Sequence, residues 1–111
     1  MKVVEEMHDG AGIVAVAGRL DSTTAMEFED RFVTKAGTYS HVVVDCAELD
    51  FVSSAGLRVL LLLKKRLSAT GGEVVLCAPT ASVREVLDVS GLSDLLPMYD
   101  TRGLALEAIG H

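Results

Sequence analysis

Aromatic residues, cysteine, proline and basic residues are all scarce in this sequence. It has no Trp, 5% aromatic residues, two Cys and two Pro, yet 50% of its 111 residues are hydrophobic. Such a chain can bury an aliphatic core in one domain and is too short for a second. Its 10 Lys and Arg are outnumbered by 16 Asp and Glu, which gives a formal net charge of −6. That balance argues against nucleic acid and against an anionic membrane surface as partners, because both are bound through clustered basic side chains.

Long apolar runs are absent too. The run from Val59 to Leu63 ends at Lys64, well short of the length that crosses a bilayer. No apolar region follows the start of the chain, as it does in a signal peptide. We therefore expect a cytoplasmic protein without direct membrane binding, in which Cys46 and Cys77 are reduced, small, buried residues.

The motifs that bind metals and cofactors are missing. There is no Cys-x-x-Cys and no pair of histidines at helical spacing. Gly71-Gly72 is not followed by Lys-Ser or Lys-Thr, and the chain has no Gly-x-Gly-x-x-Gly. We expect neither a metal nor a cofactor.

Hydrophobic periodicity and turn residues predict strands that alternate with helices. The predicted strands are residues 2–8, 13–17, 41–45, 73–78 and a short edge strand within 95–99. The predicted helices run from the polar residues 21–24 to about 35, from the two serines 53 and 54 to about 70, over 81–89 and over 101–109. This alternation is typical of parallel strands with crossover helices. We predict one α/β domain over residues 1–111, with a mixed, mostly parallel sheet of four to five strands and about four helices.

The stretch of residues 45–58 is the one around which the rest is organised. It predicts the end of a strand, a short loop, and a helix whose first turn opens at Ser53 and Ser54. The first turn of a helix offers free N–H groups. The serines are therefore either N-caps or acceptors of a phosphate, whose charge a helix N-terminus tolerates. Three carboxylates fall in the same loop, either as solvated groups or as groups that position a cation or a protein partner: Asp45, Glu48 and Asp50.

Catalysis by Ser54 is disfavoured by its surroundings in the sequence. A nucleophilic serine needs an activating base and an oxyanion site, and Val52 stands where the Gly-x-Ser-x-Gly motif requires its first glycine. The histidines lie near the start, at a strand entrance and at the chain end: His8, His41 and His111. We predict that the protein is not an enzyme, with a small serine hydrolase as the least favoured alternative.

The helix after the serines has two distinct faces at about 100° per residue. The apolar face consists of Leu57, Leu60, Leu61 and Leu67, with Leu63 at its border. The opposite face carries Arg58, Lys65 and Arg66, with Leu62 among them and Val59 near their margin. Leu62 is then either a single exposed leucine or part of a patch that binds a partner.

Several segments, in this order, resemble the STAS domain of sulfate transporters and bacterial anti-sigma factor antagonists. They are Gly18–Asp21, His41–Asp45, Leu49–Leu57, Gly71–Cys77 and Val89–Leu92, and together they span nearly the whole chain. Because the chain is short and stands alone, we expect it to be similar to the free-standing bacterial antagonists rather than to the tail of a transporter.

The resemblance implies a binding module without catalytic activity. In this family the unphosphorylated antagonist binds an anti-sigma factor, often itself a serine kinase, and so frees a sigma factor. The kinase phosphorylates a serine at the start of the second helix, which weakens binding, and a serine phosphatase reverses the modification. A constitutive scaffold and an accessory subunit of a membrane transport system remain as alternatives.

The resemblance also assigns residues. The acceptor serine of the family, in a Met-Asp-Ser-Ser/Thr-Gly-Leu pattern, matches Ser54, and the family's aspartate after Gly-x-Leu, near the acceptor, matches Asp21. Ser53 stands where the family often has Asp, which supplies a second hydroxyl, and Ala55 stands where it often has Ser or Thr. We expect the partner-binding surface to comprise Asp21, Ser53, Ala55, Gly56, Leu57, Arg58 and Leu62.

Overall fold

The computed structural model describes residues 1–110 and contains a six-stranded sheet with helices on both faces. The strands are β1 (Lys2–His8), β2 (Ala11–Leu20), β3 (Val42–Asp45), β4 (Leu49–Val52), β5 (Val74–Cys77) and β6 (Met98–Tyr99). The helices are α1 (Ala25–Phe28), continued by the π-helical turn η1 (Glu29–Val33) and the 3-10 turn η2 (Ala36–Thr38), then α2 (Ser54–Ser68), α3 (Ala81–Ser90) and α4 (Arg102–Ile109).

The sheet is mixed and mostly parallel, as the sequence predicts. β1 and β2 form an antiparallel hairpin, and the parallel strands follow in the order β2-β3-β5-β6. β4 lies off this row and pairs in parallel with the end of β2, where Leu20 faces Val52. Because β2 has ten residues, it pairs with β3 along its first half and with β4 at its end. The carboxyl ends of β2 and β4 therefore meet at one edge of the sheet.

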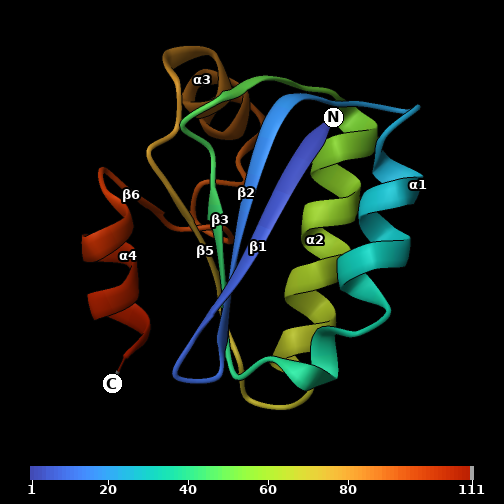
Figure 1. Ribbon diagram of the computed structural model, residues 1–111. Coiled ribbons are helices and arrows are strands. Elements are labelled where there is room, and N and C mark those ends of the chain that lie inside the picture. The colour runs from blue at the N-terminus through green and yellow to red at the C-terminus, as the bar shows by residue number, and fades with distance from the viewer. Residues whose placement is uncertain (111) are drawn as a thin grey trace.

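Two apolar clusters fill the space between the sheet and its helices. In Figure 1, α1 and α2 lie side by side on one face of the sheet and α4 lies on the other. The larger cluster, which includes Phe28, Phe32 and Leu63, packs under α1 and α2. The smaller one includes Ile13 and Val43 from the sheet and Ala105 and Ile109 from α4. The domain is thus a three-layer α/β structure.

The two cysteines lie in different clusters. Cys46 belongs to the larger cluster and Cys77 to the smaller one. Both are buried and free, which confirms their interpretation as small core residues. Burial raises the pKa of the Cys46 thiol to about 12 and that of Cys77 to about 11, so neither is a thiolate at neutral pH.

The prediction missed β4 and placed its residues in a loop. The strand has only four residues, of which Leu49 and Val52 are buried while Asp50 and Phe51 are exposed. Such a pattern has no two-residue period, and the strand exists because it pairs with β2. The placement of three carboxylates in one loop was therefore wrong: Asp45 ends β3 and Asp50 lies within β4.

The helix predicted to run to about residue 35 is interrupted. α1 is four residues long, and in the following π-helical turn Thr34 donates its N–H to the carbonyl of Glu29, five residues earlier, at 3.2 Å. The predicted stripe is buried all the same: Ala25, Phe28, Phe32 and Ala36. The wider turn also buries Val33, which follows Phe32 directly and which a period of 3.6 residues does not place on that stripe.

α2 is buried over a wider arc than its periodicity predicts. Val59, predicted near the charged margin, is fully buried, and Leu62, predicted among the basic residues, packs partly against the larger cluster. The sheet covers one side of α2, and α1 with η1 covers a second (Figure 1). Because two adjoining sides are covered, the predicted placement of Val59 was wrong, whereas Leu62 keeps part of its side chain exposed.

This packing predicts that alanine substitution of two neighbouring leucines lowers the free energy of unfolding by different amounts. We expect Leu63→Ala to lower the free energy of unfolding by about 2–5 kcal/mol, because it leaves a cavity in the core. Leu62→Ala, the same change at a partly exposed site, is expected to cost clearly less. Urea unfolding followed by circular dichroism measures both, and equal losses would contradict the arrangement around α2.

Candidate functional site

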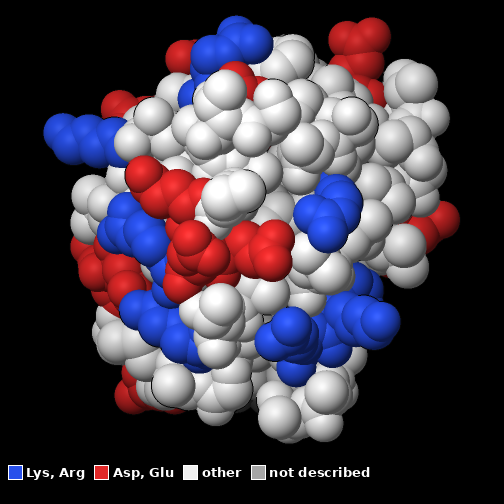
Figure 2. All heavy atoms as spheres, turned by 90° about the vertical axis from the view of Figure 1, so that its right-hand side faces the viewer, with Lys and Arg blue, Asp and Glu red and all other residues white. Residues whose placement is uncertain are grey.

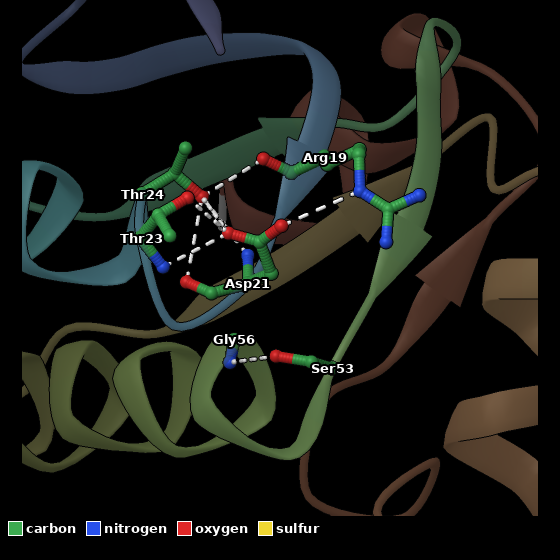
Figure 3. Close-up of polar contacts among 6 residues, drawn as sticks. All are labelled: Arg19, Asp21, Thr23, Thr24, Ser53 and Gly56. Atoms are coloured by element: carbon green, nitrogen blue, oxygen red, sulfur yellow. Dashed lines mark hydrogen bonds and ion pairs between the residues drawn. The ribbon is translucent and has the colours of Figure 1, made fainter.

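The first turn of α2 lies against the carboxyl end of β2 (Figure 3). Ser53 donates its N–H to the carbonyl of Leu20 at 3.0 Å, and its Oγ accepts the N–H of Gly56 at 3.4 Å. Ser53 is therefore the N-cap of α2. Ser54 is the first helical residue and is exposed, and its hydroxyl makes no hydrogen bond within residues 1–110. The two adjacent serines thus have different surroundings.

Gly56 makes the close approach of α2 to β2 possible. A Cβ at this position would lie 2.3 Å from the carbonyl oxygen of Leu20 and 2.9 Å from Cγ1 of Val52. Such distances are far inside van der Waals contact, so only glycine fits without a shift of the backbone. Gly56 is buried and has no side chain, and it acts by positioning the serines.

Asp21 organises the turn that follows β2. Its Oδ1 accepts the N–H of Thr23 at 3.0 Å and the Oγ1 hydroxyl of Thr23 at 2.7 Å, and its Oδ2 accepts Nε of Arg19 at 3.3 Å. The bonds from Thr23 above all lower the pKa of Asp21 to about 2, so the group is ionised at neutral pH. Because Asp21 follows Leu20, whose carbonyl accepts the Ser53 N–H, the Asp21 turn lies next to the start of α2, and its carboxylate points towards Thr23 and Arg19 (Figure 3).

Thr24 stabilises the same turn through two hydrogen bonds of its hydroxyl group. Its Oγ1 donates to the carbonyl of Arg19 at 2.9 Å and accepts the N–H of Asp21, also at 2.9 Å. Ala25 donates its N–H to the carbonyl of Asp21 at 2.8 Å. The orientation of the Asp21 carboxylate is therefore set before any partner binds.

Arg19 and Phe51 form an exposed pair that the sequence did not assign to the site. The Arg19 guanidinium lies over the Phe51 ring, 4.2 Å from its centroid, and its Nε also bonds to Asp21. Phe51 is 37% exposed. Both residues stood within segments that carried the family resemblance, but their contact requires the pairing of β4 with β2, which the pattern did not predict.

The remaining predicted site residues follow Ser54 along α2. Ala55 and Leu57 are partly buried, and both pack against the larger cluster. Arg58 is exposed, one turn after Ser54, and its Nη1 lies 3.9 Å from Oε1 of Glu29. Leu62 lies a further turn along and is only partly exposed. The structure thus brings Asp21, the serines and Gly56 together, with Arg58 one turn along α2 from Ser54 and Leu62 two turns along.

The histidines of the described chain lie at the other end of the sheet. His8 ends β1 and faces Ala11, at the start of β2. His41 precedes β3, and its Nδ1 accepts the N–H of Glu73 at 3.0 Å. His111 lies outside the described residues. Neither described histidine is therefore placed to activate Ser54.

The surface chemistry adds two further observations. Among residues 1–110, no group of three metal-ligating side chains converges, and no helix has the length and apolarity that a membrane span requires. Figure 2 views the face formed by α1 and α2, on which basic and acidic side chains are interspersed. This face has no broad basic field of the kind that phosphate backbones require.

The close contact at Gly56 predicts that a side chain at this position destabilises the fold. We expect Gly56→Ala to destabilise the fold by about 1–3 kcal/mol through overpacking, despite the better helix propensity of alanine. Gly37→Ala is the matched control, since a Cβ at Gly37 would meet nothing within 4 Å. The control is expected to be neutral or stabilising by up to about 1 kcal/mol. Chemical unfolding tests both variants, and an unaffected Gly56→Ala protein would refute the proximity of α2 and β2.

The ionised state of Asp21 predicts a pH dependence. Its pKa is about 2 in the folded protein and 3.8 ordinarily, so its stabilising effect is present above 3.8 and is lost as pH falls through 2. We expect Asp21→Asn to be less stable than the wild type at neutral pH and this difference to shrink in acid. The control is Asp88→Asn on α3, where no loss at neutral pH is expected. Urea unfolding across this pH range measures both, and a difference independent of pH would contradict the assignment.

Comparison with known proteins assigns the chain to a family. The family model of the STAS domain matches residues 2–105. BtrV of Bordetella bronchiseptica is 37% identical over 97% of this chain and 94% of its own. The anti-sigma F factor antagonist of Paenibacillus polymyxa is 32% identical over 96% of this chain and 92% of its own.

Solved structures agree with this assignment. The crystal structure of an anti-sigma factor antagonist from Mycobacterium paratuberculosis is 29% identical, with a TM-score of 0.84 over 99% of this chain and 94% of that one. Unphosphorylated SpoIIAA, at 22% identity, shares the fold with a TM-score of 0.86 over 98% and 96% of the two chains. The predicted fold class is confirmed, and this chain belongs to the STAS domain family.

Proposed function

We propose that this protein is an anti-sigma factor antagonist whose binding is switched by phosphorylation of Ser54. Unphosphorylated, it binds and sequesters an anti-sigma factor that is itself a serine kinase, and a serine phosphatase restores this state. The protein performs no chemistry of its own and works in the cytoplasm, where sigma factors act. The names of the relatives from Paenibacillus polymyxa and Mycobacterium tuberculosis, both called antagonists of an anti-sigma F factor, support the proposal.

The observation that carries the proposal is the difference between Ser53 and Ser54. The Ser53 hydroxyl accepts the Gly56 N–H as a helix cap, and loss of such a cap costs about 0.5–2 kcal/mol. The Ser54 hydroxyl has no hydrogen-bond partner within the described chain and is exposed. A kinase can therefore modify Ser54 without breaking the local structure, whereas modification of Ser53 removes the cap.

Phosphorylation of Ser54 would change the charge of the surface rather than the conformation of the backbone. A phosphoserine carries a charge of about −1.5 to −2 at neutral pH. At Ser54 it would stand at the N-terminus of α2, where the helix dipole and free N–H groups favour an anion. The ionised Asp21 lies beside the same turn. Phosphorylation then adds negative charge to a surface that already carries one carboxylate, and a partner fitted to the neutral hydroxyl is repelled.

The proposed partner surface extends from the Asp21 turn along α2. Ser53, Ala55, Leu57 and Arg58 surround Ser54, and the exposed part of Leu62 continues the surface for two turns. Gly56 belongs to the set through the position it gives the serines, since it is buried. We add Arg19 and Phe51, because aromatic and arginine side chains dominate the energy of protein interfaces.

Phosphorylation by the cognate anti-sigma factor tests the proposal. We expect ATP and this kinase to phosphorylate the wild type at Ser54, mapped by mass spectrometry, and to leave Ser54→Ala unmodified. Ser54→Asp is expected to bind the unmodified kinase at least about tenfold more weakly, through like-charge repulsion, with an unchanged circular dichroism spectrum. Ser54→Ala is the matched control and is expected to bind.

Other outcomes would contradict the proposal in distinct ways. A phosphate found only on Ser53 would overturn the choice of acceptor. Equal binding by Ser54→Asp, Ser54→Ala and the wild type would favour a constitutive scaffold or an accessory subunit of a transport system. Labelling of Ser54 by a serine-directed fluorophosphonate would favour a hydrolase.

A further inference from the structure

β1 forms one edge of the sheet. It has seven residues, and among residues 1–110 its strand partner is β2 alone. Val4 and Met7 on this strand are 51% and 56% exposed. An edge strand of this length presents main-chain groups that can pair with another chain. The edge lies outside the proposed Ser54 site, and the inference drawn from it does not rest on the proposed function.

The direction of the main-chain groups of β1 follows from the register of β2. Gly12 donates its N–H to the carbonyl of His41 on the β3 side, and N–H directions alternate along a strand. The odd-numbered residues of β2 therefore point to β1, where they pair with even-numbered residues such as Val4, opposite Ala15. Val3, Glu5 and Met7 consequently point their N–H and C=O groups away from the sheet.

In one antiparallel register, the charges on β1 of one copy are complementary to those on β1 of a second copy. We propose that β1 pairs with β1 of a second copy of this chain, with Val4 opposite Val4 on the twofold axis. Lys2 of each copy then lies opposite Glu6 of the other, and Val3 lies opposite Glu5. In this register the outward-pointing Val3 and Glu5 exchange main-chain hydrogen bonds. The Lys2–Glu6 and Val4–Val4 pairs are of the non-hydrogen-bonded kind, whose side chains approach more closely.

One of the two neighbouring twofold registers is unfavourable. It places Glu5 opposite Glu5 on the axis, and like charges directly opposite each other are destabilising. Glu5 is an ionised group, since hydrogen bonds from Tyr39 and Lys35 lower its pKa. The other neighbour, centred on Val3, places Lys2 opposite Val4 and forms no Lys2–Glu6 pair. The charges therefore favour the register centred on Val4.

The surroundings of Lys2 and Glu6 also favour this contact. Arg102 serves two carboxylates, since it lies 3.1 Å from Glu6 and 2.8 Å from Asp45. Lys2 is exposed and forms no ion pair within the described residues. A second copy supplies an anionic partner to Lys2, and it supplies a second cation to Glu6, which otherwise shares Arg102 with Asp45. Because one strand buries less area than a standard interface, the dimer is weak and depends on concentration.

Amide exchange of the wild type tests the pairing without any variant. With rising protein concentration, we expect the amides of Val3 and Glu5 to become protected from hydrogen exchange. Those of Val4 and Glu6 are already bonded to β2 and are expected to change little. Sedimentation velocity over the micromolar to millimolar range should show the same transition from monomer to dimer.

Charge reversal tests the register. Lys2→Glu and Glu6→Lys are each expected to weaken the dimer about tenfold or more, because two ion pairs become two repulsions. An equimolar mixture of the two variants is expected to form a heterodimer, since each acidic residue of one then faces a basic residue of the other. Glu85→Lys on α3 makes the same charge change elsewhere and is expected to dimerise as the wild type does.

The proposal fails if the wild type stays monomeric at millimolar concentration. It also fails if a dimer forms but survives both reversals, which would place the contact on another surface. Concentration-dependent protection of Val4 and Glu6 in place of the odd-numbered residues would exclude the proposed edge pairing.

Discussion

The site depends on the contact between the carbonyl of Leu20 and the first turn of α2. This oxygen accepts the N–H of Ser53 at 3.0 Å and leaves no space for a side chain at Gly56. Because Leu20 ends β2 and precedes Asp21, the contact fixes the Asp21 turn relative to the two serines. β4 brings the chain to this point, since its pairing with β2 sets Val52 beside Leu20, one residue before the N-cap. A glycine and one hydrogen bond thus join segments that lie some 30 residues apart in the sequence.

Around this contact most polar groups are already engaged with their neighbours. Thr23 and Arg19 bond the Asp21 carboxylate, Thr24 closes the turn, and Ser53 caps α2. Such local bonds hold each group in one orientation and satisfy it before a partner arrives. Ser54 differs, because its hydroxyl faces solvent with no hydrogen bond in the described residues. A modification there changes charge at a surface whose geometry is set by other residues, which is the requirement for a switch that leaves the fold intact.

Sequence patterns predicted what depends on local chemistry. The strands around Val43 and Val75 are short apolar runs, and Thr80 and Gly91 mark the two ends of α3 as a cap and a left-handed stop. The patterns failed where a distant contact decides the structure. β4 exists through its pairing with β2, and α2 is covered on a second side by α1 and η1. For the same reason the start of a helix at Ser53 and Ser54 was predicted from sequence, whereas the contact of Arg19 with Phe51 was not.

The net charge of the chain does not determine how the surface around Ser54 responds to an added charge, because the response depends on the charged side chains nearby. Near Ser54, Arg19 already faces Asp21, and Arg58 already faces Glu29. Exposed pairs of this kind contribute about 0–1 kcal/mol and bind weakly, yet each cation has an anionic neighbour before any phosphate arrives. A phosphate on Ser54 would therefore leave an excess of negative charge directed at the solvent. At the β1 edge the charges are not paired in this way. Lys2 has no ion-pair partner within the described chain, and Glu6 shares Arg102 with Asp45. The cations near the phosphate proposed at Ser54 are thus already paired, and the ammonium group of Lys2 forms no ion pair within the described chain. Each of these two charges is therefore a point where another molecule can be repelled or attracted.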